Sequence, residues 1–172
     1  MKFTLFAAFL AASTALSAFA GEQFVDQTGY AVSGYDVVAY RSLNANPVGQ
    51  AQPEAVPGKA SITADYNGAT FAFASKENRA KFLENPAFYV PQYDGHCAFG
   101  VSKGGKVPGN PNLWRIVDDK LYLNITTTVV GFWEEDIPGN INKAENNWVN
   151  IEDAAASSNP IPKWTSQAPA KN

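Results

Sequence analysis

Two β-hairpin patterns in the middle of the chain restrict the fold more than any other feature of the sequence. In the first, residues 62–66 and 69–73 flank the dipeptide Asn67-Gly68, which suits a type I′ turn. In the second, residues 113–117 and 121–125 are joined by residues 118–120. Regular strand–helix–strand units, which a parallel wound sheet needs, are not evident. We therefore predict an α+β fold, in which a small antiparallel sheet built from hairpins packs with several short helices.

Helix signals follow each hairpin. Ser75 is a suitable N-cap for a helix over residues 76–84. Within residues 130–148, apolar side chains recur every three or four positions, as they do on one face of an amphipathic helix. Pro138 should divide this stretch into two helices, with Asp136 as the cap of the second.

The two ends of the chain differ in composition from its middle. Residues 1–20 resemble a secretory signal peptide, with a positive charge near the start, an apolar run, and the small-x-small motif Ala18-Phe19-Ala20. Residues 21–151 then form a single domain, and the Ala- and Pro-rich residues 152–172 are predicted to be a disordered tail. We expect a periplasmic or secreted protein that has no membrane attachment after the signal is cleaved.

Composition narrows the classes of function. With 16 acidic and 13 basic residues, the chain has a formal net charge of −3, which gives no electrostatic reason to expect a nucleic-acid partner. One cysteine excludes an internal disulfide and a zinc site made of several thiolates from one chain. No phosphate-binding loop or Ser/His/Asp arrangement is evident, so we expect no organic cofactor, and an enzyme is the less favoured class.

One run of the sequence is similar to a known family. Residues 66–82 resemble the core of a YHS domain, which has a hairpin with glycine at the turn, an aromatic-x-aromatic-x-Ser strand end, and a helix ending in Lys-Phe. The flanking motifs within residues 34–40, 91–93, 97–99 and 121–124 resemble the secreted, stand-alone branch of that family, some of whose members are labelled as selenoprotein candidates. The resemblance covers about residues 24–149.

The resemblance implies a metal-related function, because YHS modules are fused to copper-type transport ATPases and other metal-handling proteins. The metal-linked modules carry two cysteines, one before the serine at the strand end and one in the first turn of the next helix. This chain has Ala74 and Asn78 at those places. The usual thiolate pair is therefore absent, and metal binding by that pair does not carry over.

His96-Cys97 is the one pair of soft or imidazole ligands in the predicted domain. Asp36, the expected cap of a helical turn over residues 37–40, and Asp94 are candidate hard ligands or proton partners. The leading hypothesis is a copper or zinc site at Cys97 and His96, with Asp36 and Asp94 as further ligands. Since one thiolate and one imidazole supply two ligands, such a site is weak or is shared by a homodimer across a twofold axis.

Two other functions stay open at this point. Cys97 could begin a short helix within residues 95–101, where backbone donors would stabilise its thiolate for redox chemistry with a partner's thiol. Alternatively, the chain is a non-catalytic interaction domain, in which Cys97 is a small buried apolar residue and His96 an ordinary loop residue. The surroundings of the Cys97 sulfur distinguish the chemical hypotheses from the structural one.

Overall fold

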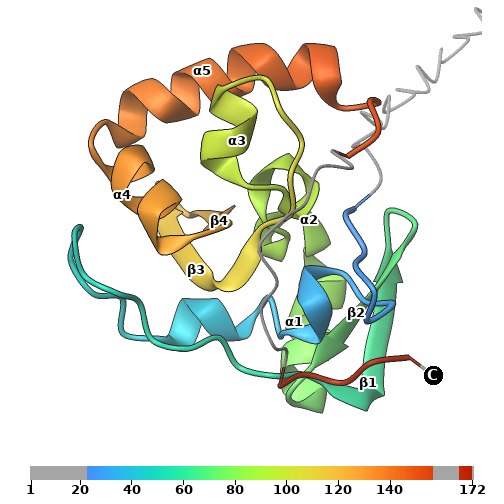
Figure 1. Cartoon of the computed structure of the whole chain (residues 1–172). Coiled ribbons are helices and arrows are strands. Elements are labelled where there is room, and N and C mark those ends of the chain that lie inside the picture. Colours follow the sequence, from blue (N-terminus) through green and yellow to red (C-terminus); the bar gives the residue numbers. More distant parts are fainter. Residues whose placement is uncertain (1–22, 157–166, 172) are drawn as a thin grey trace, which may run out of the picture.

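The computed structural model describes residues 23–156 and 167–171, and these residues form an α+β fold (Figure 1). Strands β1 (Lys59–Tyr66) and β2 (Ala69–Phe73) make one antiparallel hairpin, and β3 (Asn110–Val117) and β4 (Lys120–Asn124) make another. The predicted fold class is confirmed, although the hairpins form two separate two-stranded sheets. The predicted signal peptide lies outside the described residues.

Both hairpin turns contain two residues with left-handed backbones. Asn67 and Gly68 have φ of 45° and 73°, as a type I′ turn requires. Asp118 and Asp119 have φ of 47° and 60°, so the second turn has the same form. Lys120, which the sequence placed in this turn, is the first residue of β4.

The helices begin where the capping residues indicate. Helix α1 (Lys76–Glu84) starts after Ser75, whose Oγ accepts a hydrogen bond from the Asn78 backbone N–H. Helices α4 (Thr127–Glu134) and α5 (Ile137–Ile151) are separated as predicted, with Pro138 in the first turn of α5. Their caps are the side chains of Thr126 and Asp136.

Several short helical segments complete the described chain. These are the 3₁₀ turns η1 (Val32–Gly34), η2 (Ala39–Ser42) and η3 (Gln92–Gly95), and the short helices α2 (Pro86–Tyr89) and α3 (Ala98–Ser102). The proline that ends α1 also begins α2, because the fixed φ of proline suits the first turn of a helix.

The second hairpin joins two hydrophobic clusters. On the β4 strand, Leu121 and Leu123 pack in a cluster with the first hairpin and α1, whereas Tyr122 packs in a cluster with α3, α4 and α5. This alternation follows from the two faces of a strand. Figure 1 shows α3, α4 and α5 at the upper end of the molecule and the first hairpin at the lower end. Both clusters therefore depend on β4.

Part of the predicted tail contacts the domain. The Lys171 backbone N–H donates to the Thr28 carbonyl at 2.7 Å, and the Gln167 N–H donates to the Tyr35 hydroxyl at 3.1 Å. The prediction of disorder stays a prediction for residues 157–166 and 172, which lie outside the described chain. Within the described ranges, no helix is both long enough and apolar enough to cross a membrane.

Candidate functional site

Asp36 is a buried structural residue beside Tyr35 and Val37 of the cluster that contains the first hairpin. Its side chain is fully buried, and Oδ1 accepts hydrogen bonds from the backbone N–H groups of Val38 and Ala39. Oδ2 accepts from the Ala74 backbone N–H at 2.8 Å and from the Asn78 side-chain amide at 2.7 Å. Asp36 thus joins the start of η2 to the junction between β2 and α1, and both of its oxygens are occupied.

Cys97 caps helix α3 from inside the protein. The side chain is fully buried, and Sγ accepts a hydrogen bond from the Gly100 N–H at 3.4 Å. The thiol is 3.5 Å from Asn124 Oδ1, to which it donates. Burial raises the pKa of Cys97, and this effect exceeds the opposing effect of nearby backbone N–H groups. The thiol is therefore protonated at neutral pH and has no contact with solvent.

His96 precedes this cysteine but has different surroundings. Tyr93 and Asp94 have left-handed backbones, with φ of 56° and 53°, and the resulting bend brings the His96 ring against the Tyr93 carbonyl. Nδ1 lies 2.9 Å from that carbonyl oxygen, which can only accept, so Nδ1 carries the hydrogen. Burial lowers the pKa of His96 to about 4, so the ring is neutral at pH 7 and Nε2 has a free lone pair.

Among the described residues, five buried side-chain polar atoms have no hydrogen-bond partner. Three of them are His96 Nε2, Asp94 Oδ2 and Gln23 Oε1, and the other two are the Tyr93 hydroxyl and Trp133 Nε1. Gln23 is held in place by its amide nitrogen, which donates to Asp94 Oδ1 at 2.7 Å. Burial is the largest cause that raises the pKa of Asp94 to about 7, and the nearby Glu152 adds to it. Buried polar atoms are costly without a partner, so each of these atoms has a hydrogen-bonding or ligating capacity that the described residues leave unused.

A hollow of about 580 Å³ is lined by two of these residues, His96 and Gln23, and Asp94 contacts it only through its hydrogen bond to Gln23. His96 and Gln23 line it together with Phe24, Lys106 and residues 152–156. The ring of His96 lies between two aromatic rings, with centroid distances of 5.2 Å to Phe24 and 6.0 Å to Trp148. We call this cavity the His96 hollow.

Lys106 forms one rim of the His96 hollow. Its Nζ donates to the backbone carbonyls of Glu152 at 2.6 Å and Ala154 at 2.8 Å, which ties the end of α5 to the loop after α3. Its positive charge also favours the neutral form of His96. Lys106 therefore contributes to the shape of the hollow and to the charge state of the imidazole.

The structure brings His96 and Asp94 into one turn and leaves Asp36 and the Cys97 sulfur in other surroundings. Among the residues that it describes, no group of three or more His, Cys, Asp or Glu side chains could hold a metal ion. Reasoning from the sequence missed Gln23 and Lys106, because neither belongs to a motif. Gln23 is 71 residues from its partner Asp94, so no local pattern indicates that contact.

Comparisons with known proteins give no relative from which a role for these residues could be inferred. No protein-family model matches the chain. A search of curated proteins found no match, and a search of solved structures found none either.

Proposed function

We propose that this protein binds a divalent transition-metal ion, zinc or copper, in the His96 hollow. One observation carries the proposal: His96 is a buried neutral imidazole whose Nδ1–H is fixed on a backbone carbonyl and whose Nε2 has no partner in the described chain. Imidazoles that bind metals are commonly oriented in this way, because the hydrogen bond at one nitrogen selects the tautomer that leaves the other free.

Asp94 is the proposed second ligand. Its Oδ2 has no described partner, and Gln23 holds the other oxygen. A bound cation would replace the proton that the raised pKa retains on this carboxyl group. Gln23 Oε1 is the proposed third ligand. A set of imidazole, carboxylate and amide oxygen suits zinc or Cu(II) better than Cu(I), which prefers sulfur.

The proposed site is exchangeable rather than structural. Structural zinc sites usually have four protein ligands, three or four of which are thiolates or imidazoles. Here three side chains contribute, and the hollow leaves room for a ligand from solution or from a partner molecule. A role in binding and passing on a metal ion fits this arrangement. The resemblance of residues 66–82 to a YHS domain supports the same class of function, and we retain export to the periplasm or exterior as part of the proposal.

Calorimetric titration with zinc and with Cu(II) tests the proposal. We expect one ion per chain, with binding weakened about tenfold or more in His96→Asn and in Asp94→Asn. Asparagine can still donate to the Tyr93 carbonyl at position 96 and accept from Gln23 at position 94, so both variants keep the local contacts. Cys97→Ser is the matched control and should bind like the wild type. Equal affinity in the wild type and His96→Asn would overturn the assignment.

Proton release gives a second test of the Asp94 ligand. With a pKa of about 7, Asp94 is about half protonated at pH 7, so binding should release about half a proton per ion. Titrations in buffers with different ionisation enthalpies measure this number. We expect the release to disappear in Asp94→Asn. Unchanged release in that variant would show that another group gives up the proton.

The thiol redox alternative receives no support from the surroundings of Cys97. A reactive cysteine needs an accessible thiolate, whereas this sulfur is enclosed and burial raises its pKa. Labelling with a thiol reagent at neutral pH should therefore be slow in the folded protein and rapid in urea. Rapid labelling of the folded protein would restore the redox hypothesis.

A further inference from the structure

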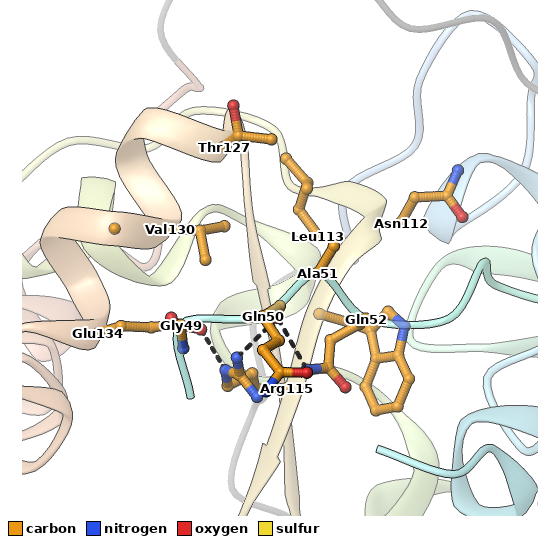
Figure 2. Close-up of a pocket in the computed structure, with 12 residues that line it drawn as sticks. Gly49, Gln50, Ala51, Gln52, Asn112, Leu113, Arg115, Thr127, Val130 and Glu134 are labelled. Atoms are coloured by element: carbon orange, nitrogen blue, oxygen red, sulfur yellow. Dashed lines mark hydrogen bonds and ion pairs between the residues drawn. The ribbon is translucent and has the colours of Figure 1, made fainter. Parts of the chain in front are cut away.

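A second cavity has no lining residue in common with the His96 hollow. Residues 43–56, which we call the strap, connect η2 to the first hairpin and pass beside β3 and α4. A pocket of about 250 Å³ lies between strap residues 49–52, strand β3 and helix α4 (Figure 2). Leu113 of β3 and Val130 of α4 point into the space between these elements, and Ala51 of the strap adjoins it.

Polar contacts fix the position of the strap. The guanidinium of Arg115 donates to three strap carbonyls, those of Asn46, Pro47 and Gln50. It also pairs with Glu134 of α4, whose other oxygen accepts from the Gly49 N–H at 2.7 Å. Trp114 Nε1 donates to the Pro53 carbonyl at 2.8 Å.

Side-chain packing contributes little to the same part of the strap. Residues 44–51 are exposed, and Val48 has 58% of its surface accessible. The hydrogen bonds and the ion pair therefore hold the strap beside α4 without side chains that fill the intervening space. The pocket is a consequence of this arrangement.

Gly131 keeps the α4 side of the pocket open. It lies inside the helix, where glycine is less favourable than alanine by about 1 kcal/mol. A Cβ atom at this position would meet no described atom within 4 Å, and the backbone has no left-handed angle there. Neither packing nor backbone geometry in the described chain therefore requires glycine. Its missing side chain leaves space beside Val130 and Thr127, which also line the pocket.

The charges of the pocket indicate a neutral ligand. Arg115 and Glu134 are its charged lining residues; they are 8% and 7% exposed and are paired with each other. A charged ligand would have to separate this pair or remain without a counter-charge in a partly buried place, and both are unfavourable. The other lining side chains are neutral: Leu113, Val130 and the Trp114 ring are apolar, and Gln50, Gln52, Asn112 and Thr127 are polar without charge.

We infer that this pocket binds a small, neutral, mainly apolar organic molecule, such as an aromatic ring with a short substituent. An apolar cavity of ~150 Å³ is sufficient for a benzene ring, so the pocket has room for a somewhat larger molecule. This second binding site is independent of the proposed metal site.

Titration of the ¹⁵N-labelled protein with p-cresol tests this inference by NMR. The backbone amides of Gly49 and Gly131 and the indole N–H of Trp114 should shift and saturate together. The matched charged compounds 4-methylbenzoate and 4-methylbenzylamine should bind at least about tenfold more weakly, because the paired Arg115 and Glu134 offer them no free counter-charge. Saturable shifts that leave these three groups unchanged, or equal binding of the three compounds, would overturn the inference.

Variants of α4 locate the site. Gly131→Leu places a side chain in the pocket and should weaken p-cresol binding about tenfold or more. Phe132→Leu is the control, since Phe132 is 49% exposed and does not line the pocket. If Gly131→Leu is unfolded, Gly131→Ala fits the available space and should weaken binding by a smaller factor. Unchanged affinity in a folded Gly131 variant would contradict the inference, and His96→Asn should bind p-cresol like the wild type.

Discussion

At the scale of single residues, two buried aspartates in this protein have different hydrogen-bond surroundings. Asp36 accepts four hydrogen bonds and stabilises the junction of η2, β2 and α1. Asp94 accepts one from Gln23 and leaves its second oxygen without a described partner. Both are nearly inaccessible, so burial alone does not separate a structural acid from a candidate ligand. The number of hydrogen-bond donors around each carboxyl group separates them.

Asp36→Asn should destabilise the protein by about 3 kcal/mol. The amide nitrogen would face a backbone or side-chain donor in place of an acceptor oxygen, and buried donors would lose their partner. Urea denaturation measures the change. Asp65→Asn, at an exposed carboxylate that accepts from Thr70, is the matched control and should change stability by less than about 0.5 kcal/mol. Similar losses in both variants would contradict the structural role of Asp36.

Asp94 should make folding stability depend on pH. Its pKa is about 7 in the folded protein and ~3.9 in an unfolded chain, so the folded state holds more protons over this range. Stability from Asp94 therefore falls as the pH rises from about 4 to 7. His96 acts in the opposite sense: its pKa is about 4 when folded and ~6.5 when unfolded, so its contribution rises between those values.

When Asp94 is replaced, the contribution of His96 to the free energy of unfolding should still rise with pH, and no falling contribution from position 94 should oppose it. The free energy of unfolding of Asp94→Asn minus that of the wild type should increase by on the order of 2 kcal/mol as the pH rises from about 4 to 7. Asparagine also tolerates the left-handed backbone at this position. Urea denaturation at a series of pH values, with a chelator present to remove metal ions, measures the difference. A difference that stays constant with pH would contradict the raised pKa of Asp94.

At the scale of elements, the two hairpins have the same turn geometry with different residues. The first turn has glycine at its second position, where φ is 73°, whereas the second turn has Asp119, where φ is 60°. Glycine adopts such angles without steric cost, and aspartate does so less easily. The second hairpin therefore carries some backbone strain that the first avoids.

Asp119→Gly should stabilise the protein by about 0.5–1 kcal/mol, and Gly68→Ala should destabilise it by about 1 kcal/mol. Asp119 also lies 3.6 Å from Arg41, but its side chain is 86% exposed, so the loss of this ion pair should have little effect. Thermal unfolding of the two variants measures both changes. A loss of stability in Asp119→Gly would show that the Arg41 contact outweighs the relief of strain.

At the scale of the whole molecule, β4 makes the two hydrophobic clusters parts of one cooperative unit. Leu121 and Leu123 belong to one cluster and Tyr122 to the other. The strap adds a second connection, because Arg115 and Glu134 bind it to both β3 and α4. Neither cluster keeps its packing if β4 is lost.

We therefore expect a single unfolding transition for the domain. Trp114 reports on one cluster and Trp133 on the other, and both are buried. Trp114→Phe keeps Trp133 and Trp148 of the second cluster, whereas the double variant Trp133→Phe/Trp148→Phe keeps Trp114 of the first. In urea, the fluorescence of each variant should show the same midpoint as its circular dichroism. Two separate midpoints within one variant would mean that the clusters unfold independently.

Short-range signals were sufficient to predict the two hairpins and the three longer helices α1, α4 and α5. The Asn67-Gly68 turn, the Ser75 cap and the break at Pro138 depend on neighbouring residues, whose steric and hydrogen-bonding preferences act over a few positions. The fold class followed from these elements. The sequence also indicated His96 as a candidate site residue, because it is the single imidazole of the chain. Asp94 was a candidate together with Cys97 and Asp36, and no local signal separated it from them.

The orientation of the site depended on contacts between distant parts of the chain. Cys97 and His96 are adjacent, yet the sulfur is enclosed against Asn124 whereas the imidazole borders a hollow formed with residues 23 and 152. The pairing of Gln23 with Asp94 and the binding of the strap by Arg115 likewise join segments about 70 residues apart. Such contacts arise when complete elements pack against one another. This packing sets the burial and the charge state of each side chain, and no local sequence pattern encodes it.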